Sequence, residues 1–239
     1  MGFGLNAILE GEVSAYEWWI STHGVVVDNT TGMSRVFTWR GQRMNANMSP
    51  IAVSSPVVQT LGTMGGKQVV DFRQSVTGGN TSIGTGVVPL FEPHFPVTGS
   101  PYIAFYGQRG PAGNTGISIL AGGSARVQLL LTTTQRVLSR HVSSSGNVDT
   151  TSANNSFVDT EVALIETYRG GGNANLAKDV VSLGTTAMAN DYAAVGNRFI
   201  VGSTTSLFDC AVGCHIWCAS TPSDAVRGQV RDWLDAYFA

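Results

Sequence analysis

Three cysteines and a histidine near the C-terminus are the first candidates for chemistry. Cys210, Cys214 and Cys218 are spaced four residues apart, and His215 follows the second of them. Zinc binds thiolates and imidazoles, and each thiolate must lie about 2.3 Å from the ion. The flanking residues predict a strand, in which residues four apart are separated by about 13 Å. We therefore expect no shared metal ion or disulfide. The cysteines should be reduced, small apolar side chains on the buried face of the strand, with His215 on the opposite face.

Carboxylates are the second candidates, because glycoside hydrolysis needs two of them about 5 to 10 Å apart. Glu161 and Glu166 flank an apolar run, so they are expected on opposite faces of a strand and too far apart to act together. Asp71 stands alone in the sequence, and Glu92 lies among prolines. The sequence therefore predicts no catalytic residue, and glycoside hydrolysis is the least favoured function.

A calcium site would need six to eight oxygen ligands. Asp149, Asn154, Asn155 and Asp159 come nearest to that density, and we interpret them as a polar loop. The four histidines have no carboxylate partner nearby in the sequence and are expected to be structural. The sequence thus predicts neither a bound metal nor a cofactor.

The residues best suited to binding lie in a loop bounded by prolines at 93 and 96. Because proline cannot donate to a sheet ladder, this loop should remain outside the sheets and hold its side chains at a rim. We predict that the contact residues of this rim loop are Phe91, Glu92, His94 and Phe95.

The other aromatic residues divide between possible contact positions and the core. Exposed rings could recognise sugars, and the candidates include Trp18, Trp19, Tyr102, Tyr106 and Trp217. Most aromatic side chains are buried, however, because each removes a large apolar area from water. We expect the core to contain Trp39, Phe72, Trp217 and Trp233.

Short apolar runs with period-two character dominate the chain and must position these residues. They are β-branched or aromatic and are bounded by Gly, Pro, Asn or Ser, which is typical of strands. Strands are predicted near residues 25–27, 35–39, 68–72, 102–106, 117–120, 126–131, 137–142, 158–168, 179–183, 198–201 and 210–218. Because no helical pattern separates them, we predict an all-β fold: a two-sheet antiparallel jelly-roll sandwich.

The two ends of the chain have a different character. Residues 222–238 predict a C-terminal α-helix, capped by Thr221 with Pro222 at its first position and Asp224 at its third. Its apolar positions recur at three- and four-residue steps and include Val230 and Leu234, whereas Arg227 and other charged residues are expected in solvent. The apolar segment 1–22 should supply either the first strand or an arm that contacts another subunit, with the sandwich domain spanning 23–239.

The order of three stretches resembles the concanavalin A-like lectin/glucanase family in its laminin-G-like form. The stretches are the tryptophan strand at 36–41, the proline, glycine turn and Phe-ending strand at 55–72, and the terminal strand with its helix. The resemblance spans about residues 16–239. It implies a jelly roll whose concave face and rim loops bind sugars or protein surfaces, and it does not imply catalysis.

Composition limits the partners. Only 13 % of the residues are charged and the net charge is −2, so neither nucleic acid nor an anionic membrane is an expected partner. Residues 1–20 lack the basic start of a signal peptide, which predicts synthesis in a host cytoplasm.

By its likeness to phage proteins, we expect a non-enzymatic structural or adhesion protein on a virion, in the head or tail. Its partners would be other virion proteins, further copies in a homo-oligomer, or a host-surface glycan. The alternative is a soluble or exported carbohydrate-binding module.

Overall fold

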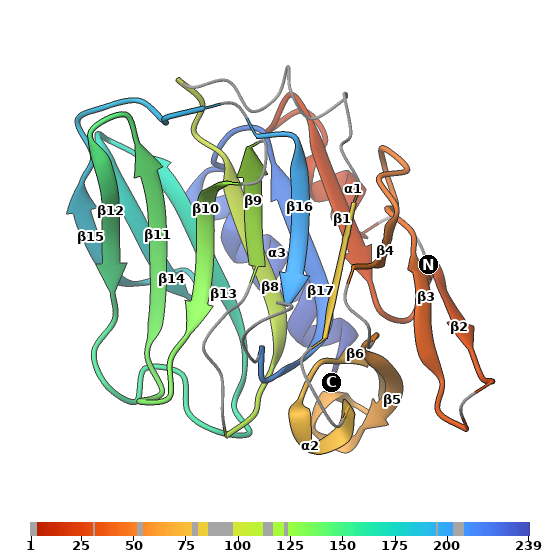
Figure 1. The fold of residues 1–239 in the computed structure, drawn as a ribbon. Coiled ribbons are helices and arrows are strands. Elements are labelled where there is room, and N and C mark those ends of the chain that lie inside the picture. Colours follow the sequence, from red (N-terminus) through yellow and green to blue (C-terminus); the bar gives the residue numbers. More distant parts are fainter. Residues whose placement is uncertain are drawn as a thin grey trace.

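The computed structural model confirms the expected all-β sandwich of two antiparallel sheets, with an α-helix at the C-terminal end (Figure 1). The structure describes residues 4–30, 32–51, 55–77, 81–85, 98–111, 117–121, 124–194, 196–202 and 208–239. The rim loop predicted to bind, with Phe91, Glu92, His94 and Phe95, lies outside these residues.

The first sheet is centred on β17 (Cys210–Cys218) and β8 (Tyr102–Arg109), which pair with each other. On one side β17 pairs with β1 (Tyr16–Ile20), and on the other β8 is followed by β13 (Val162–Gly170), β14 (Asn173–Lys178) and β15 (Val181–Ala187). The start of β17 also pairs with β6 (Lys67–Asp71), which forms a hairpin with β5 (Val57–Leu61) around a 3-10 turn at Gly62–Met64.

The second sheet faces the first. Its order is β12 (Gly146–Thr151), β11 (Val137–Ser143), β10 (Ser124–Leu131), β9 (Ile117–Ala121), β16 (Arg198–Gly202), β7 (Ser82–Thr85), β4 (Met48–Pro50), β3 (Arg35–Trp39) and β2 (Val25–Asp28). A single pairing between β3 and β5 joins the two sheets along one edge. A short helix, α2 (Gln74–Thr77), follows β6.

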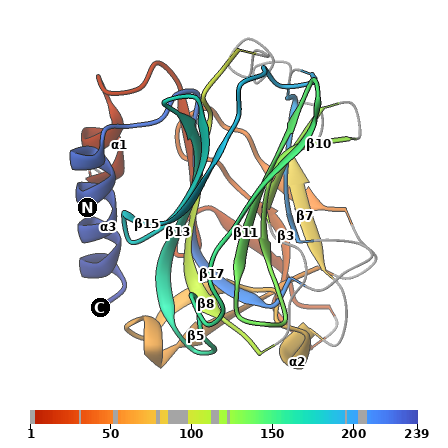
Figure 2. The ribbon, with the colours of Figure 1, turned by 90° about the vertical axis from the view of Figure 1, so that its left-hand side faces the viewer.

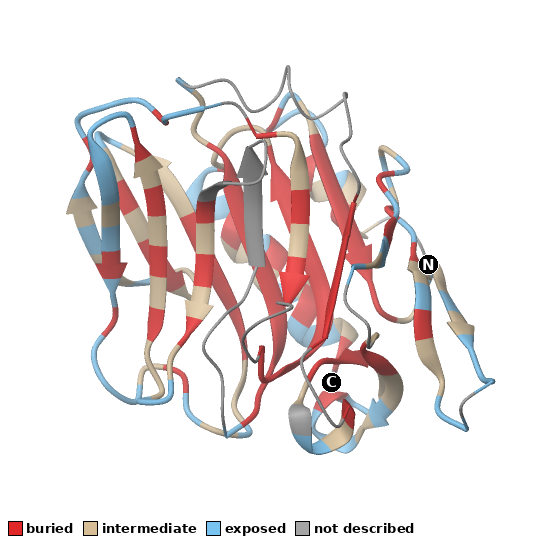
Figure 3. Ribbon diagram, in the orientation of Figure 1, coloured by how far each residue is buried: buried red, intermediate tan, exposed pale blue. Residues whose placement is uncertain are grey.

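Two helices cover the outer face of the first sheet, so the molecule has three layers (Figure 2). They are α1 (Gly4–Leu9) and α3 (Asp224–Tyr237), which contact each other and are separated by almost the whole chain in sequence. One hydrophobic core lies between the sheets and includes Trp19, Phe105 and Trp217. The other lies under the helices and includes Ile216 and Leu234. Strands β1, β8 and β17 are therefore buried on both faces along their whole length (Figure 3).

A β-bulge at Gly213 corrects one prediction about the cysteines. The pairing of β17 with β8 skips one residue between Val212 and Cys214, which turns the following side chains to the other face. Cys210 consequently lies in the core between the sheets, while Cys214 and Cys218 lie under the helices. The three cysteines are free and buried, as predicted, but they do not share one face.

Helix α3 begins two residues later than predicted and has a different cap. The Ser223 side chain, rather than that of Thr221, accepts the amide N–H of Val226. Thr221 instead donates to the carbonyls of Ser100 and Arg169, in the loop before β8 and at the end of β13. The hydroxyl that was expected to start the helix therefore ties the preceding segment to the sheet.

Candidate functional site

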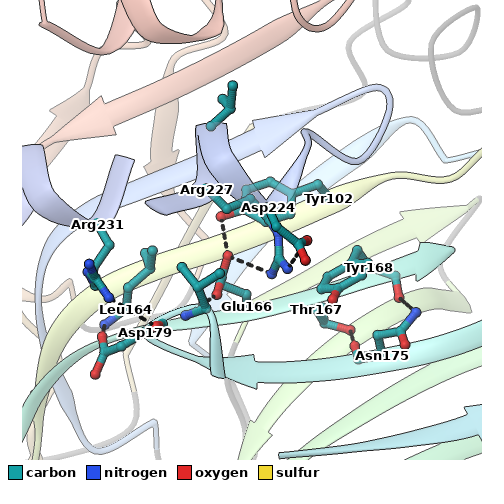
Figure 4. A network of polar contacts seen from close by, with 12 residues as sticks. Tyr102, Leu164, Glu166, Thr167, Tyr168, Asn175, Asp179, Asp224, Arg227 and Arg231 are labelled. Atoms are coloured by element: carbon teal, nitrogen blue, oxygen red, sulfur yellow. Dashed lines mark hydrogen bonds and ion pairs between the residues drawn. The ribbon is translucent and has the colours of Figure 1, made fainter. Parts of the chain in front are cut away.

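A buried ion pair joins α3 to the first sheet (Figure 4). Arg227 of α3 lies 3.2 Å from Glu166 of β13, and the two side chains are 2 % and 0 % exposed, which corrects the prediction that Arg227 faces solvent. Glu166 also accepts hydrogen bonds from the Tyr102 hydroxyl and the Val180 amide, both at 2.9 Å, and Arg227 donates to Asp224 at 2.7 Å. Burial raises the pKa of Glu166, and the Arg227 charge opposes that rise. Because the pair is sealed from solvent, it serves to fasten α3 to the sheet.

Two other carboxylates considered in the sequence, Glu161 and Asp71, have partners of their own. Glu161 lies 2.6 Å from Lys178, so Glu161 and Glu166 are held by different cations. Asp71 does not stand alone as expected from the sequence, because its buried carboxylate accepts hydrogen bonds from Arg73 on both oxygens. These acids are engaged in ion pairs that hold the fold together.

The polar residues considered for calcium are not brought together. Asp149 pairs with Arg140 at 2.7 Å, and Asp159 lies 3.5 Å from Arg109, whereas the two asparagines between them line a surface recess. Among the residues that the structure describes, no group of three or more His, Cys, Asp or Glu side chains could hold a metal ion.

An aromatic pocket opens between the two helices and the first strand. Its cavity volume is about 140 Å³, and α1, β1, the turn after β1, the loop after β3 and α3 all contribute to it. The residues that line this aromatic pocket are Asn6, Trp18, Ile20, His23, Gln42, Trp233 and Tyr237.

The rings of the aromatic pocket are held in fixed orientations. Trp233 and Tyr237, one turn apart on α3, are stacked with centroids 5.0 Å apart and planes inclined by 19°. Trp18 meets Trp233 edge-on at 6.2 Å, so two walls of the pocket stand nearly perpendicular. The ammonium group of Lys67 lies 5.2 Å from the centre of the Tyr237 ring. Such ring geometry is typical of stable aromatic packing.

Hydrogen bonds fix the polar groups around these rings. The Trp18 indole N–H donates to the Asn6 side chain at 3.0 Å, and the Tyr237 hydroxyl lies 2.6 Å from the Thr22 hydroxyl. The Gln42 side-chain NH₂ group donates to the Arg40 carbonyl at 2.9 Å. Hydrogen bonds within the protein therefore fix the side chains that line the pocket.

The buried carboxylate of Glu17 positions the loop that carries Gln42. Its oxygens accept the amide N–H groups of Trp18, Arg43, Met44 and Ala46 at distances of 2.7–3.1 Å. Burial raises the pKa of Glu17, while these backbone donors favour its charged form. Loop 41–46 is therefore held against β1 by one side chain.

Sequence reasoning found only part of this pocket. Trp18 was a candidate contact residue, whereas Trp233 was expected in the core and is half-buried at the pocket wall. The available signal was the spacing of Trp233 and Tyr237, which places two large rings one turn apart on a helix. Asn6 and Gln42 carried no such signal, because only the tertiary fold brings α1 and loop 41–46 to the helix.

The described helices include none with the length and apolar character required to cross a bilayer.

The fold is similar to that of botulinum neurotoxin binding domains. The serotype G binding domain has a TM-score of 0.62 and 11 % identity, over 92 % of this chain and 51 % of that structure. The receptor binding domain of the C/D mosaic serotype has a TM-score of 0.60 and 8 % identity, over 89 % of this chain and 51 % of that structure. A structure of botulinum neurotoxin type C has a TM-score of 0.59 and 8 % identity, over 88 % of this chain and 50 % of that structure.

This chain therefore spans about half the length of those structures, and at such identities the likeness shows the fold alone. No protein-family model matches the sequence, and no curated protein does. The jelly-roll-like sandwich is confirmed, whereas membership of the concanavalin A-like family stays a prediction.

Proposed function

We propose that this protein is a non-enzymatic binding protein that recognises carbohydrate in the aromatic pocket. The proposal is carried by the composition of the pocket, in which the stacked rings of Trp233 and Tyr237 lie beside the amides of Asn6 and Gln42. An aromatic face covers the apolar C–H face of a sugar ring, and amides donate and accept hydrogen bonds as hydroxyls do. Ligand pockets commonly combine apolar walls with a few fixed polar groups in this way.

The size of the pocket limits what it holds. Its volume of about 140 Å³ is smaller than the pockets of drug-sized ligands, which begin at about 300 Å³. It therefore accommodates one terminal sugar ring, with the rest of the glycan in solvent. Affinity for a single site of this kind should be modest, in the range of about 0.1–1 mM.

The structural neighbours support carbohydrate or protein receptors as the class of ligand. Cell entry of neurotoxin type C depends upon interaction with two ganglioside molecules. The neurotoxin DC binding domain has been solved in complex with SialylT and, separately, with rat synaptotagmin II. Because their likeness to this chain is one of fold, the aromatic pocket rather than the neighbours defines the proposed site.

A glycan array followed by titration calorimetry with the best glycan tests this function. Gln42→Ala removes a pocket amide and should weaken binding about tenfold, which corresponds to about 1.4 kcal/mol. Gln229→Ala removes the same group from the exposed face of α3 and is the matched control. Retention of no glycan by the wild-type protein, or equal affinities for the two variants, contradicts the proposal.

We also propose that the protein is displayed on a virion, as a head-decoration or tail-associated protein of a bacteriophage. Its low charge, its glycine-rich composition and its three buried free thiols support this setting. Its partners there would be virion proteins, further copies of itself or a host-surface glycan. Mass spectrometry of purified particles should detect it in fixed stoichiometry. A monomer that binds an isolated glycan saturably and is missing from particles would instead be the alternative, a soluble or exported carbohydrate-binding module.

A further inference from the structure

A second recess lies between two loops on other elements of the fold. The loop between β10 and β11 and the loop between β12 and β13 border a wide and open recess of about 400 Å³. The lining residues of this polar recess are Thr133, Thr134, Gln135, Asn154 and Asn155. It shares no lining residue with the aromatic pocket.

Backbone hydrogen bonds lock the two loops together. The amide of Asn155 donates to the carbonyl of Thr134 at 3.4 Å, and the amide of Phe157 donates to that of Gln135 at 3.2 Å. The Phe157 ring is fully buried and contacts Phe105 in the core between the sheets. The backbone groups of the loops are thereby engaged with one another, and the positions of the side chains that line the recess are fixed by the sandwich beneath.

Two of the lining residues adopt a backbone conformation that favours glycine. Gln135 has φ 57° and Asn155 has φ 58°, and both belong to the same recess although they lie on different loops. A left-handed conformation costs a residue such as Gln on the order of 1 kcal/mol and persists only where the surroundings impose it. At Gln135 this conformation closes the turn between β10 and β11, in which the Gln135 amide donates to the Thr132 carbonyl at 3.1 Å.

A buried arginine lies beneath these loops. Arg109 is 1 % exposed and donates to the Thr132 carbonyl, and its Nε is 3.5 Å from the Asp159 carboxylate. Within the described part of the chain, its Nε and Nη1 atoms have no hydrogen-bond partner. At the rim, Arg136 donates to the Asn154 side chain. The two arginines therefore hold the loops in place, Arg109 from beneath and Arg136 at the rim.

We propose that the polar recess is a second carbohydrate site, which binds a neutral sugar and makes the protein bivalent. Its lining consists of hydroxyls and amides, groups that donate and accept at once and so match the hydroxyls of a sugar. None of the lining residues is charged, and hence a neutral ligand is expected. The recess needs no contribution from the aromatic pocket, so either site can fail without the other.

Amide NMR spectra of the whole chain, titrated with neutral methyl glycosides of glucose, galactose, mannose and N-acetylglucosamine, test this site. At least one probe should give saturable shifts at residues 133–135 and 154–155 with a dissociation constant on the order of 1 mM. Shifts confined to the aromatic pocket, or an absence of saturable shifts at the recess, would overturn the inference. Shifts at the recess with none at the aromatic pocket would instead sink the proposed function.

Glycine variants separate the side chains from the backbone. The double variant Gln135→Gly/Asn155→Gly keeps the left-handed backbone without strain and removes both amides, so it should abolish the recess shifts or weaken binding at least tenfold. Asn45→Gly, at φ 56° and far from the recess in sequence, is the matched control and should leave the recess shifts unchanged. Thr133→Val, which removes one hydroxyl, should weaken the same shifts if the glycine variant unfolds. Unchanged recess binding in a folded variant refutes the site.

Discussion

Replacing Arg227 with methionine would test whether the buried ion pair fastens α3 to the first sheet. The substitution keeps an unbranched apolar side chain in place but removes the cation that faces Glu166 (Figure 4). The carboxylate would retain its hydrogen bonds from the Tyr102 hydroxyl and the Val180 amide, which are neutral donors. A fully buried carboxylate would therefore be left without its counter-charge.

The expected cost follows from that burial. Removing one member of a buried pair costs about 3–5 kcal/mol, because the remaining charge is no longer compensated. For a chain of this size, this lowers the melting temperature by about 6–20 °C. Glu166→Gln should cost less, about 1–3 kcal/mol, because Arg227 would keep its bond to Asp224 at 2.7 Å and its position 4.4 Å from the centre of the Tyr168 ring.

Urea denaturation of both variants and the wild type between pH 7 and pH 4 is the assay. The pKa of Glu166 is raised by burial in the wild type, and loss of Arg227 raises it further. A raised carboxyl pKa favours the folded state below the unfolded pKa, and that advantage is lost as the pH rises through the folded pKa. The deficit of Arg227→Met should hence shrink on acidification, whereas that of Glu166→Gln should not shrink in this way. A deficit below about 1 kcal/mol at pH 7, or one that is independent of pH, would refute the reasoning.

Three further outcomes are expected. Glu17→Gln turns an NH₂ group toward two backbone donors and should lower the free energy of unfolding, measured by urea denaturation, by about 2–3 kcal/mol. A change near zero would argue against the role of Glu17 in holding loop 41–46 against β1. Gly213→Ala places a methyl group 2.6 Å from the Phe238 ring and should cost about 1–3 kcal/mol, seen as a lower melting temperature; an unchanged value would mean that the ring yields freely. Burial lowers the pKa of His215 to about 3, so the contribution of this residue to the free energy of unfolding is complete above about pH 6.5 and falls by up to about 5 kcal/mol toward pH 3. His215→Leu should flatten this pH dependence in urea denaturation. The same pH dependence in both proteins would contradict the prediction.

The sandwich could be predicted because burial follows a period of two in several strands. Residues of Val137–Ser143 alternate between buried and half-buried, and the sequence pattern predicts that strand correctly. Strands such as Gly146–Thr151 and Asn173–Lys178 were missed, because they are rich in Gly, Asn and small residues. They become strands through hairpin pairing with a neighbour, which local propensity does not record.

The incorrect predictions concern residues whose burial is decided by contacts with another layer of the fold and not by the local sequence pattern. A charged residue on a helix is expected in solvent, and only the approach of β13 gives Arg227 a buried partner. An alternating strand is expected to keep one register, and the bulge at Gly213, where the Phe238 ring leaves little room for a side chain, divides the cysteines between the two faces. The aromatic pocket combines Asn6, Gln42 and Tyr237, which no sequence spacing relates. Such features depend on contacts between distant parts of the chain.

Because the three thiols are divided between the two hydrophobic cores, their reactivity can report which layer of the protein opens first. Cys214 and Cys218 become reachable by an alkylating reagent once the helices lift, whereas Cys210 is reached only after the sheets separate. Burial raises the pKa of all three thiols, so none should react while its layer stays closed. Peptide mapping of timed alkylation would thus reveal the sequence of events in unfolding from a single unlabelled sample.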